Sequence, residues 1–531
     1  MNTMKLGMNL TLLFLAASLS VFAQKKELET ITENDLKAHL EFIASDYMQG
    51  RDFNTEIPGL KITADYLKAQ CRKIGLKPGG DDYFQAVDME SVVPDPDNTF
   101  IRLKDINTDA ELYKNKDIFM FGGNAAEKDT IEGEVVFAGY GWYNEETKYN
   151  DTEGLEIKDK IVLIMTRNIE TALDTSIKEN NTTLEMMKMR KAFMGGAKAL
   201  IIVPDPMNPD KKWFNMVKSY IMGGSYLLKG AKPSLNIPGK LIFGSEELAN
   251  EMIKESGKTL KQLQQEINQT GSPKSFEVKN VKAEIQVSNL KTEVEGKNVI
   301  GIVEGSDPAL KNECVVFTAH YDHVGMTPDG EINNGADDNG SGTVALLEIA
   351  EAFAKMKKKP RRSIVFVWVT AEEKGLIGSD YYSQNPIIPL NNTLVDINLD
   401  MVGRSAEKEP DKEAALEKSL AGPNGIYIIS GGQSSELTEI SNKACKTLGM
   451  VPSDALTKAF LTRSDYFNFY KNGVPVLGVS TGLHSEYHTP KDKMDKIDYN
   501  KMERVAKYCF LVANEVANKK KRIEIDNPVS Q

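Results

Sequence analysis

The chain has 531 residues, with 65 Lys and Arg against 76 Asp and Glu, which gives a formal net charge of −11. Its hydrophobic fraction of 41% and charged fraction of 27% are ordinary for a globular protein and exclude the disordered, collagen-like and coiled-coil classes. The negative balance, without a basic stripe, argues against a nucleic-acid partner. A chain of this length is expected to form two structural units, or one large domain with an insertion.

The first predicted element is a secretory signal peptide at residues 1–23. Lys5 is followed by an apolar stretch over residues 10–22, and Val21-Phe22-Ala23 is a small-residue cleavage pattern. The stretch is too short to span a bilayer comfortably, and no later run is long and apolar enough to do so. We therefore expect a mature protein without a membrane span that is exported to the periplasm or the extracellular space.

Two amphipathic helices are expected next. Apolar residues recur at helical spacing over residues 36–43 and 62–74, and Gly75 ends the second segment. We expect these helices to open a domain whose first part occupies residues 24–110.

Residues 111–274 have a different pattern, in which short β-rich runs alternate with polar loops. The runs lie at 133–141, 160–166, 197–203 and 240–243. One helix is expected over residues 184–193. This pattern predicts an inserted, mainly β module.

From residue 275 to residue 531, strand-like and helix-like segments alternate. Continuous apolar runs predict strands buried on both faces at 314–319, 364–369, 394–399 and 474–479. Helical patterns over residues 342–356 and 437–448 lie between them. We therefore expect an α/β domain with a mixed, mostly parallel central sheet and helices on both faces.

Four of the five histidines lie in two short segments, each of which follows a predicted buried strand. The first segment contains His320 and His323, and the second contains His484 and His488. A single histidine at a strand end is usually structural. Other strands of the same sheet also end in metal-binding side chains, which favours a shared site.

These further side chains are carboxylates. Glu372 and Glu373 follow one predicted strand, Asp400 follows another, and the acidic Gly-rich loop at 335–342 contains Asp338. In an open α/β sheet, ligands bind outside the carboxyl ends of the strands, so we expect these groups to converge. Imidazole and carboxylate ligands suit catalytic Zn²⁺, and a doubled set suits two ions.

In order and spacing, these motifs resemble those of the co-catalytic zinc aminopeptidases of peptidase family M28. The matching motifs are His320-Tyr321-Asp322, the loop at 335–342, Ala371-Glu372-Glu373-Lys374-Gly375, Asn398-Leu399-Asp400-Met401 and Tyr487-His488-Thr489. The resemblance covers roughly residues 290–515 and implies a zinc-exopeptidase-like fold with two Zn²⁺ per chain. The module at 111–274 is similar to the protease-associated (PA) domain that many members carry as an insertion.

The resemblance also implies roles for individual residues as metal ligands. Asp338 would bridge both zinc ions. His320 and Asp400 would complete one site, and Glu373 and His488 would complete the other.

Further roles follow for residues beside the ligands. Glu372 would be the general base that takes a proton from the attacking water and passes it to the leaving amine. Asp322 would orient the imidazole of the metal-ligating His320, and Tyr487 would hydrogen-bond the oxyanion. No role is implied for His323 and His484, for which we expect a place outside the ligand set or at the surface.

The chain departs from the family pattern at one point. It has Ser464-Asp465-Tyr466 where family members commonly have Ser-Asp-His. No role is therefore transferred to Tyr466, which is expected to shape the specificity pocket.

The function implied by the resemblance is an exported zinc aminopeptidase whose substrates are peptides with a free N-terminus. A carboxypeptidase of the same superfamily is an alternative that the sequence separates poorly. A glutaminyl cyclase-like acyltransferase with a single zinc, and an inert peptidase-like binding protein, are disfavoured because the full set of five ligands is present.

Overall fold

The computed structural model describes residues 26–108, 110–115, 118–121, 128–173, 182–231, 239–327, 329–408 and 419–528. The expected signal peptide at residues 1–23 lies outside these residues. The chain divides into unit 1, formed by residues 1–88 and 295–531, and unit 2, formed by residues 89–294. None of the described helices has the length and apolar character needed to cross a membrane.

Unit 1 is built on a mostly parallel sheet with the strand order β1-β13-β15-β14-β16-β19-β17-β18. Strands β15, β14, β16 and β19 are parallel, whereas β13 is antiparallel to β15 and β17 is antiparallel to β19. The strands are β1 Lys77–Pro78, β13 Phe276–Val303, β14 Cys314–His320, β15 Ser363–Val369, β16 Thr393–Leu399, β17 Gly425–Ile429, β18 Val451–Ser453 and β19 Val476–Ser480.

The central strands are buried on both faces of the sheet, which explains their continuous apolar sequences. In β15, Phe366 and Trp368 pack into the core on one face, and Val365 and Val367 pack into the core on the other. The four strands predicted from apolar runs at 314–319, 364–369, 394–399 and 474–479 are all present.

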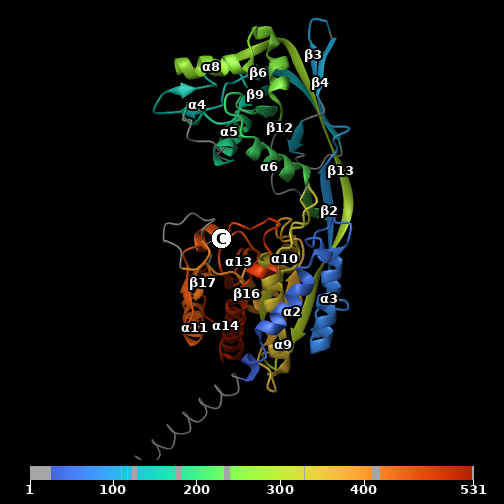
Figure 1. The fold of residues 1–531 in the computed structure, drawn as a ribbon, viewed down its shortest axis with the longest axis vertical. Coiled ribbons are helices and arrows are strands. Elements are labelled where there is room, and N and C mark those ends of the chain that lie inside the picture. The colour runs from blue at the N-terminus through green and yellow to red at the C-terminus, as the bar shows by residue number, and fades with distance from the viewer. Residues whose placement is uncertain are drawn as a thin grey trace, which may run out of the picture. The chain divides into compact units, whose positions relative to one another are not determined.

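Helices cover both faces of this sheet, as the sequence predicted (Figure 1). The first face carries α2 Glu33–Ile43, α3 Gly59–Ile74, α9 Gly342–Lys355, α11 Ser435–Thr447 and α14 Tyr499–Asn518. The second face carries α10 Ile377–Gln384, α12 Thr457–Phe460 and α13 Tyr466–Tyr470. The two opening helices were predicted correctly, since Thr32 caps α2 and Gly75 ends α3 in a left-handed conformation.

Unit 2 has its own sheet, with the order β4-β3-β13-β6-β9-β10-β12-β5. Its strands are β3 Phe100–Asp105, β4 Ala110–Asn115, β5 Phe119–Phe121, β6 Lys128–Phe137, β9 Ile161–Met165, β10 Ala199–Val203 and β12 Lys240–Phe243. Two short pairs, β2 Phe84–Pro94 with β11 Ser225–Leu228 and β7 Tyr143–Asn144 with β8 Tyr149–Asn150, lie outside this order.

Unit 2 contains more helix than the sequence suggested. The predicted helix at 184–193 is present as α5 Thr182–Met194. Four further helices are α4 Ile169–Leu173, α6 Lys211–Met222, α7 Glu246–Met252 and α8 Leu260–Thr270. These four helices were not predicted, although Thr259 and Gln262 form a capping box at the start of α8 that could have revealed it.

The unit boundaries differ from those expected at 110/111 and 274/275, because they fall after residues 88 and 294. Strands explain the difference. β2 begins before the first boundary, and β13 pairs with β3 and β6 in unit 2 through residues 276–288 and with β15 in unit 1 through residues 299–303. A strand that continues from one sheet into another leaves no change of composition at the boundary.

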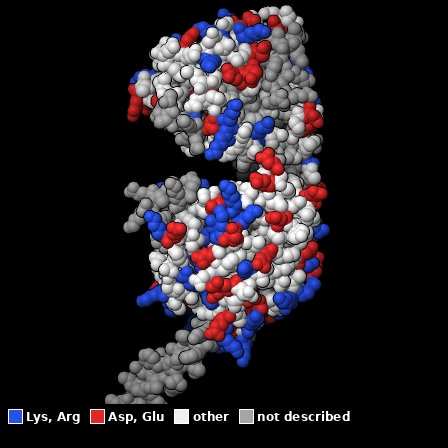
Figure 2. Space-filling view, in the orientation of Figure 1, with Lys and Arg blue, Asp and Glu red and all other residues white. Residues whose placement is uncertain are grey.

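The described surface in view in Figure 2 has basic and acidic side chains interspersed. The positive charges therefore do not gather there into the stripe that a nucleic-acid backbone requires. The four cysteines, Cys71, Cys314, Cys445 and Cys509, are buried free thiols.

Candidate metal centre

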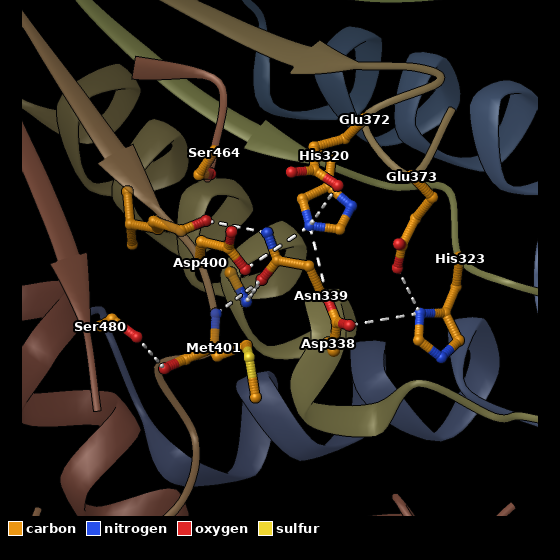
Figure 3. Close-up of polar contacts among 12 residues, drawn as sticks. His320, His323, Asp338, Asn339, Glu372, Glu373, Asp400, Met401, Ser464 and Ser480 are labelled. Atoms are coloured by element: carbon orange, nitrogen blue, oxygen red, sulfur yellow. Dashed lines mark hydrogen bonds and ion pairs between the residues drawn. The ribbon is translucent and has the colours of Figure 1, made fainter. Parts of the chain in front are cut away.

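The carboxyl ends of the parallel strands in unit 1 meet at one edge of the sheet. His320 is the last residue of β14 and lies opposite Val369, the last residue of β15. Asp400 directly follows β16, which pairs with β19, and the loop after β19 leads to His488. The topology thus brings together side chains that are far apart in the sequence, such as those of His320 and Asp400 (Figure 3).

A further side chain of the site, Asp338, comes from the tight turn η3 Ala336–Ser341 before α9. The turn depends on Gly335, whose φ is +57° and where a Cβ would lie 2.3 Å from the carbonyl oxygen of Asp338. The next residue, Asn339, is joined to Asp338 by a cis peptide bond and donates its amide to the carbonyl of Leu399 at 2.9 Å. These contacts tie the Asp338 loop to the end of β16.

Asp338 lies between two groups of side chains. Its Oδ1 is 3.4 Å from His320 Nε2, and its Oδ2 is 3.0 Å from His488 Nε2. His320 Nε2 is also 3.5 Å from Asp400 Oδ1, and His488 Nε2 is 3.1 Å from Glu373. The two oxygens of one buried carboxylate therefore face two different imidazoles, the arrangement that a bridging ligand needs.

Two sets of side chains could each hold a metal ion, and within each set the potential ligand atoms lie within 4.8 Å of one another. The first set is His320, Glu372 and Asp400, and the second is His323, Asp338, Glu373 and His488. All five residues that the resemblance implied as ligands are thus brought together, and Glu372 is beside them.

His323 is the residue that sequence reasoning missed. It is fully buried, and its Nδ1 is 3.0 Å from Glu373 Oε1 and 3.7 Å from Asp338 Oδ2. A surface position for His323 is therefore excluded, whereas a place beside the proposed ligands, in contact with two of them, agrees with the structure. Its position three residues after His320, beyond the same strand end, was the available signal.

His484 is also buried but belongs to neither set. Its Nε2 is 3.3 Å from Asp337 Oδ2, and its Nδ1 is 3.3 Å from Glu486 Oε2. A surface position for His484 is therefore excluded, whereas a place outside the ligand set agrees with the structure.

Asp322 supports the site through the backbone of the next loop. Its carboxylate accepts hydrogen bonds from the backbone N–H groups of Glu372 at 3.1 Å and Glu373 at 3.2 Å. Towards His320, the carbonyl oxygen of Asp322 lies 3.2 Å from Nδ1 and the carboxylate lies 3.7 Å away. The carboxylate of Asp322 is thus closer to the backbone of Glu372 and Glu373 than to the His320 imidazole that it was expected to orient.

A pocket opens beside the first set of metal-ligating atoms. Its polar wall contains His320, Asp338, Glu372 and Asp400. The other lining residues are Met401, Ile429, Phe460, Arg463, Ser464, Tyr466, Val479, Ser480, Leu483 and Tyr487. Most of that second wall is apolar or aromatic, which suits a substrate side chain next to a polar reaction centre.

The two aromatic residues singled out from the sequence both line this pocket. Tyr487 stacks on His488, with ring centroids 3.8 Å apart. Tyr466 is buried and donates its hydroxyl to the carbonyl of Phe460 at 2.6 Å. Tyr466 therefore stiffens the pocket wall and keeps its hydroxyl occupied.

The pKa values of the adjacent carboxyls of Glu372 and Glu373 are shifted in opposite directions. Burial raises the pKa of Glu372 well above its usual value, and nearby carboxylates, including that of Glu373, add to this effect. Burial and the charge of Asp338 also act on Glu373, but contacts with His488 and His323 outweigh them and lower its pKa to about 2. Glu372 is thus suited to carry a proton and Glu373 to stay ionised.

Neighbouring carboxylates raise the pKa values of two of the imidazoles, those of His320 and His488. Burial opposes a charge on His488, but Glu373 and Asp338 raise its pKa to about 10. Burial likewise opposes a charge on His320, yet neighbouring carboxylates, with Glu372 first among them, raise its pKa well above the usual value. A metal ion must displace these protons in order to bind, and it would supply the positive charge in their place.

The residues present fit zinc. Asp338, Glu372, Glu373 and Asp400 are buried or half-buried, and among the described residues none of them forms an ion pair with Lys or Arg. Asp400 Oδ1 is buried and accepts no hydrogen bond within the described part of the chain. Burial of several carboxylates is costly without compensating cations, and imidazole and carboxylate donors together suit Zn²⁺.

The chain is similar in sequence to known proteins over its second half. Residues 298–513 match the sequence profile of peptidase family M28. Aminopeptidase YwaD of Bacillus subtilis (strain 168) is 29% identical over 222 residues, which are 40% of this chain and 43% of the relative. Leucine aminopeptidase 1 of Pyrenophora tritici-repentis is 28% identical over 224 residues, which are 40% of this chain and 54% of the relative. The chain spans about half the length of these curated relatives.

The fold is similar to solved structures over nearly the whole chain. An aminopeptidase from Aneurinibacillus sp. strain AM-1 has a TM-score of 0.54 at 19% identity and covers 95% of this chain and 98% of its own. The structure of BSAP, a zinc aminopeptidase from Bacillus subtilis, has a TM-score of 0.51 at 19% identity and covers 94% and 98%. At this identity the similarity concerns the fold.

Proposed function

We propose that the chain belongs to peptidase family M28, whose sequence profile residues 298–513 match, and that it is a zinc-dependent aminopeptidase that removes residues from the free N-termini of peptides. The observation that carries this proposal is the placement of Asp338 between His320 and His488, with Glu372 beside them. The two relatives described above support the proposal, since both are named as aminopeptidases.

In this proposal two zinc ions are held by five residues. Asp338 serves both ions, His320 and Asp400 hold one, and Glu373 and His488 hold the other. When bound, the ions supply Lewis-acid chemistry, which makes water a nucleophile at neutral pH and polarises the peptide carbonyl.

Glu372 acts as the general base and acid. Its carboxyl lines the pocket, and its Oε2 lies 3.9 Å from His320 Nε2. A raised pKa suits a group that must take a proton from the attacking water and then give it to the leaving amine. Asp322 holds the backbone of Glu372 and thereby fixes where this carboxyl stands.

The pocket beside the centre receives the substrate's N-terminal residue. Its apolar wall, with Met401, Ile429, Phe460 and Leu483, favours an apolar side chain. Tyr487 lines the same pocket next to His488 and is positioned to donate a hydrogen bond to the developing oxyanion.

Unit 2 is proposed to be a PA-like inserted domain, and the protein is proposed to be exported after removal of residues 1–23. The strands at 133–141, 160–166 and 197–203 support the first proposal, because they were the basis of the resemblance and form β6, β9 and β10 of one sheet.

The proposed function is tested with purified protein on leucine p-nitroanilide and its N-acetylated form, with and without a zinc chelator. We expect hydrolysis of the free amine only, and loss of activity on chelation that zinc restores. Glu372→Gln should abolish turnover, whereas Glu304→Gln, an exposed glutamate of the same unit, should not. Preference for the blocked substrate would contradict an aminopeptidase, and activity without zinc would contradict the metal mechanism.

A further inference from the structure

Arg51, in the N-terminal part of unit 1, is a fully buried cation that forms no ion pair with any carboxylate within the described residues. Its guanidinium donates only to backbone carbonyls. The Nε group donates to Tyr321 at 2.9 Å, and Nη1 donates to Ile43 at 2.9 Å and Asn334 at 2.7 Å. Nη2 donates to Gly335 at 2.8 Å and more weakly to Asp338 at 3.5 Å.

Four of these five acceptors belong to two of the loops that carry the proposed metal ligands, and the fifth, Ile43, is the last residue of α2. Tyr321 follows His320 directly, and Asn334, Gly335 and Asp338 form the turn that presents the Asp338 carboxylate. We propose that Arg51 is a positioning residue of the metal centre, whose guanidinium fixes the His320 loop against the Asp338 loop. This inference rests on the proposed function, because it concerns the same zinc site.

The backbone around Arg51 reaches the same loops. His323 N–H donates to the carbonyl of Arg51 at 3.1 Å, and Gly325 N–H donates to the carbonyl of Gly50 at 3.1 Å. The approach is close, since a Cβ on Gly50 would lie 2.3 Å from the carbonyl oxygen of Gly325. Arg51 itself has a φ of 50°, a conformation that non-glycine residues rarely adopt. The segment is therefore held in place by these contacts against its local preference.

The next residue extends the contact to a third ligand-bearing loop. Asp52 Oδ1 is 2.8 Å from the ammonium of Lys374, which directly follows Glu373. Residues 50–52 thus touch the three loops that carry His320, Asp338 and Glu373. A segment from the start of the chain completes a site whose proposed ligands all lie after residue 300.

The chemistry of this contact requires arginine. The guanidinium is planar and presents its donors in a rigid fork, so one side chain can bind several carbonyls at fixed angles. A lysine keeps the charge but has one ammonium on a flexible stem, and it cannot bridge the two loops in the same way. Arg51→Lys therefore separates geometry from charge.

The opposite face of the Asp338 turn is held by an anion. The carboxylate of Asp492 accepts hydrogen bonds from the backbone N–H of Asp337 at 3.0 Å and of Asp338 at 3.0 Å. Arg51 binds the carbonyls of the turn and Asp492 binds its N–H groups. The turn is therefore restrained from both sides, and loss of either restraint is expected to displace the Asp338 carboxylate.

The test compares the full-length wild type with Arg51→Lys and with Arg362→Lys as a matched control. Arg362 is equally buried in unit 1, but it donates to Glu313 and to the carbonyl of Lys519 and lies before β15, at the opposite end of that strand from Glu372. Zinc affinity is measured by competition with a chromophoric chelator. The visible absorption of the Co²⁺-loaded protein reports the ligand geometry.

We expect Arg51→Lys to weaken zinc binding by about tenfold or more and to change the Co²⁺ spectrum. Arg362→Lys should lower the melting temperature but leave both metal readouts at the wild-type values. A folded Arg51→Lys protein with wild-type zinc affinity and spectrum would overturn the proposal, and so would equal metal effects in the two variants.

If Arg51→Lys does not fold, Asp52→Asn decides the question, because it loosens the same segment from Lys374 without touching the buried guanidinium. We expect a loss of about threefold to tenfold in zinc affinity, and unchanged zinc affinity would overturn the proposal. These readouts do not depend on peptide hydrolysis. A protein that binds zinc but does not cleave peptides would contradict the proposed function. The role of Arg51 would still be decided by the zinc affinity and the Co²⁺ spectrum of its variants.

Discussion

Glu372 and Glu373 are neighbours in the chain, yet the pKa values of their carboxyls are shifted in opposite directions. Burial and nearby acids raise the pKa of Glu372, whereas His488 and His323 lower that of Glu373 to about 2. Two adjacent residues after one strand are thus suited to different roles, Glu372 as a proton carrier and Glu373 as an anionic ligand. The difference follows from the contacts of Glu373 with His488 and His323.

Substitution of these two residues should therefore have different effects. Glu372→Gln removes the proton carrier and is expected to lower kcat by roughly 10²–10⁴-fold, with zinc affinity close to that of the wild type. Glu373→Gln removes a ligand and should weaken zinc binding. Chelator competition and steady-state kinetics on the same preparations separate the two. Equal losses of zinc affinity in both variants would contradict the assignment.

Zinc affinity should depend on pH. The pKa of His488 is raised to about 10 and that of His320 is also raised, so the metal-free protein holds protons that zinc must displace. Affinity should rise with pH while these imidazoles remain protonated, by up to about tenfold per pH unit for each proton released. Calorimetric titrations between pH 6 and 8 in buffers of different ionisation enthalpy count the protons. Binding without proton release would show that the histidines are already neutral.

Asp322→Asn should impair catalysis because it weakens the hydrogen bonds that hold the backbone of Glu372 and Glu373 in place. The carboxylate accepts the N–H groups of both Glu372 and Glu373, and an amide has only one oxygen to accept them. We expect about a 10–100-fold loss in activity or metal affinity. Asp307→Asn is the control and should have little effect, because this half-buried carboxylate pairs with Arg361, before β15 and at the opposite end of that strand from Glu372. Wild-type values for Asp322→Asn would show that the loop is held by other contacts.

Tyr487→Phe tests the hydroxyl apart from the ring. The phenyl ring can still stack on His488, so zinc affinity should not change. If the hydroxyl stabilises the oxyanion, kcat should fall by about 10²-fold with little change in KM. An unchanged kcat would show that the Tyr487 hydroxyl does not stabilise the oxyanion and that this residue only lines the pocket.

Phe317→Ala should destabilise unit 1. Phe317 is fully buried in β14 and stacks on Phe366, with ring centroids 5.5 Å apart. The cavity should lower the free energy of unfolding by about 3–5 kcal/mol. Phe42→Ala, at a position that is 39% exposed, is the matched control and should cost much less. Chemical denaturation of zinc-loaded protein measures both, and equal losses would contradict the packing argument.

The sequence predicted the parts of the fold that depend on local pattern. Strands β14, β15 and β16 are buried on both faces and therefore appear as unbroken apolar runs. Four of the five proposed ligands lie at or after the end of such a run, and Asp338 was indicated by the acidic Gly-rich loop at 335–342. α6 was missed although its apolar side chains, such as Trp213, Val217 and Ile221, recur at helical spacing and Asp210 caps its start.

Contacts between distant segments could not be predicted in this way. Arg51 lies 270 positions before Tyr321, whose carbonyl it binds, and nothing in its local sequence indicates burial. The contact of His323 with Glu373 depends on how two loops fold over the end of the sheet. Such roles become visible only when the loops are placed in space.

The division of the chain into units has a consequence for the order of assembly during synthesis. Unit 2 is continuous over residues 89–294, whereas unit 1 needs both the helices α2 and α3 and the strands after residue 295. When unit 2 has left the ribosome, the apolar faces of α2 and α3 still lack the sheet on which they pack. The start of the chain must therefore be kept from aggregating until β14, β15 and α9 have been made.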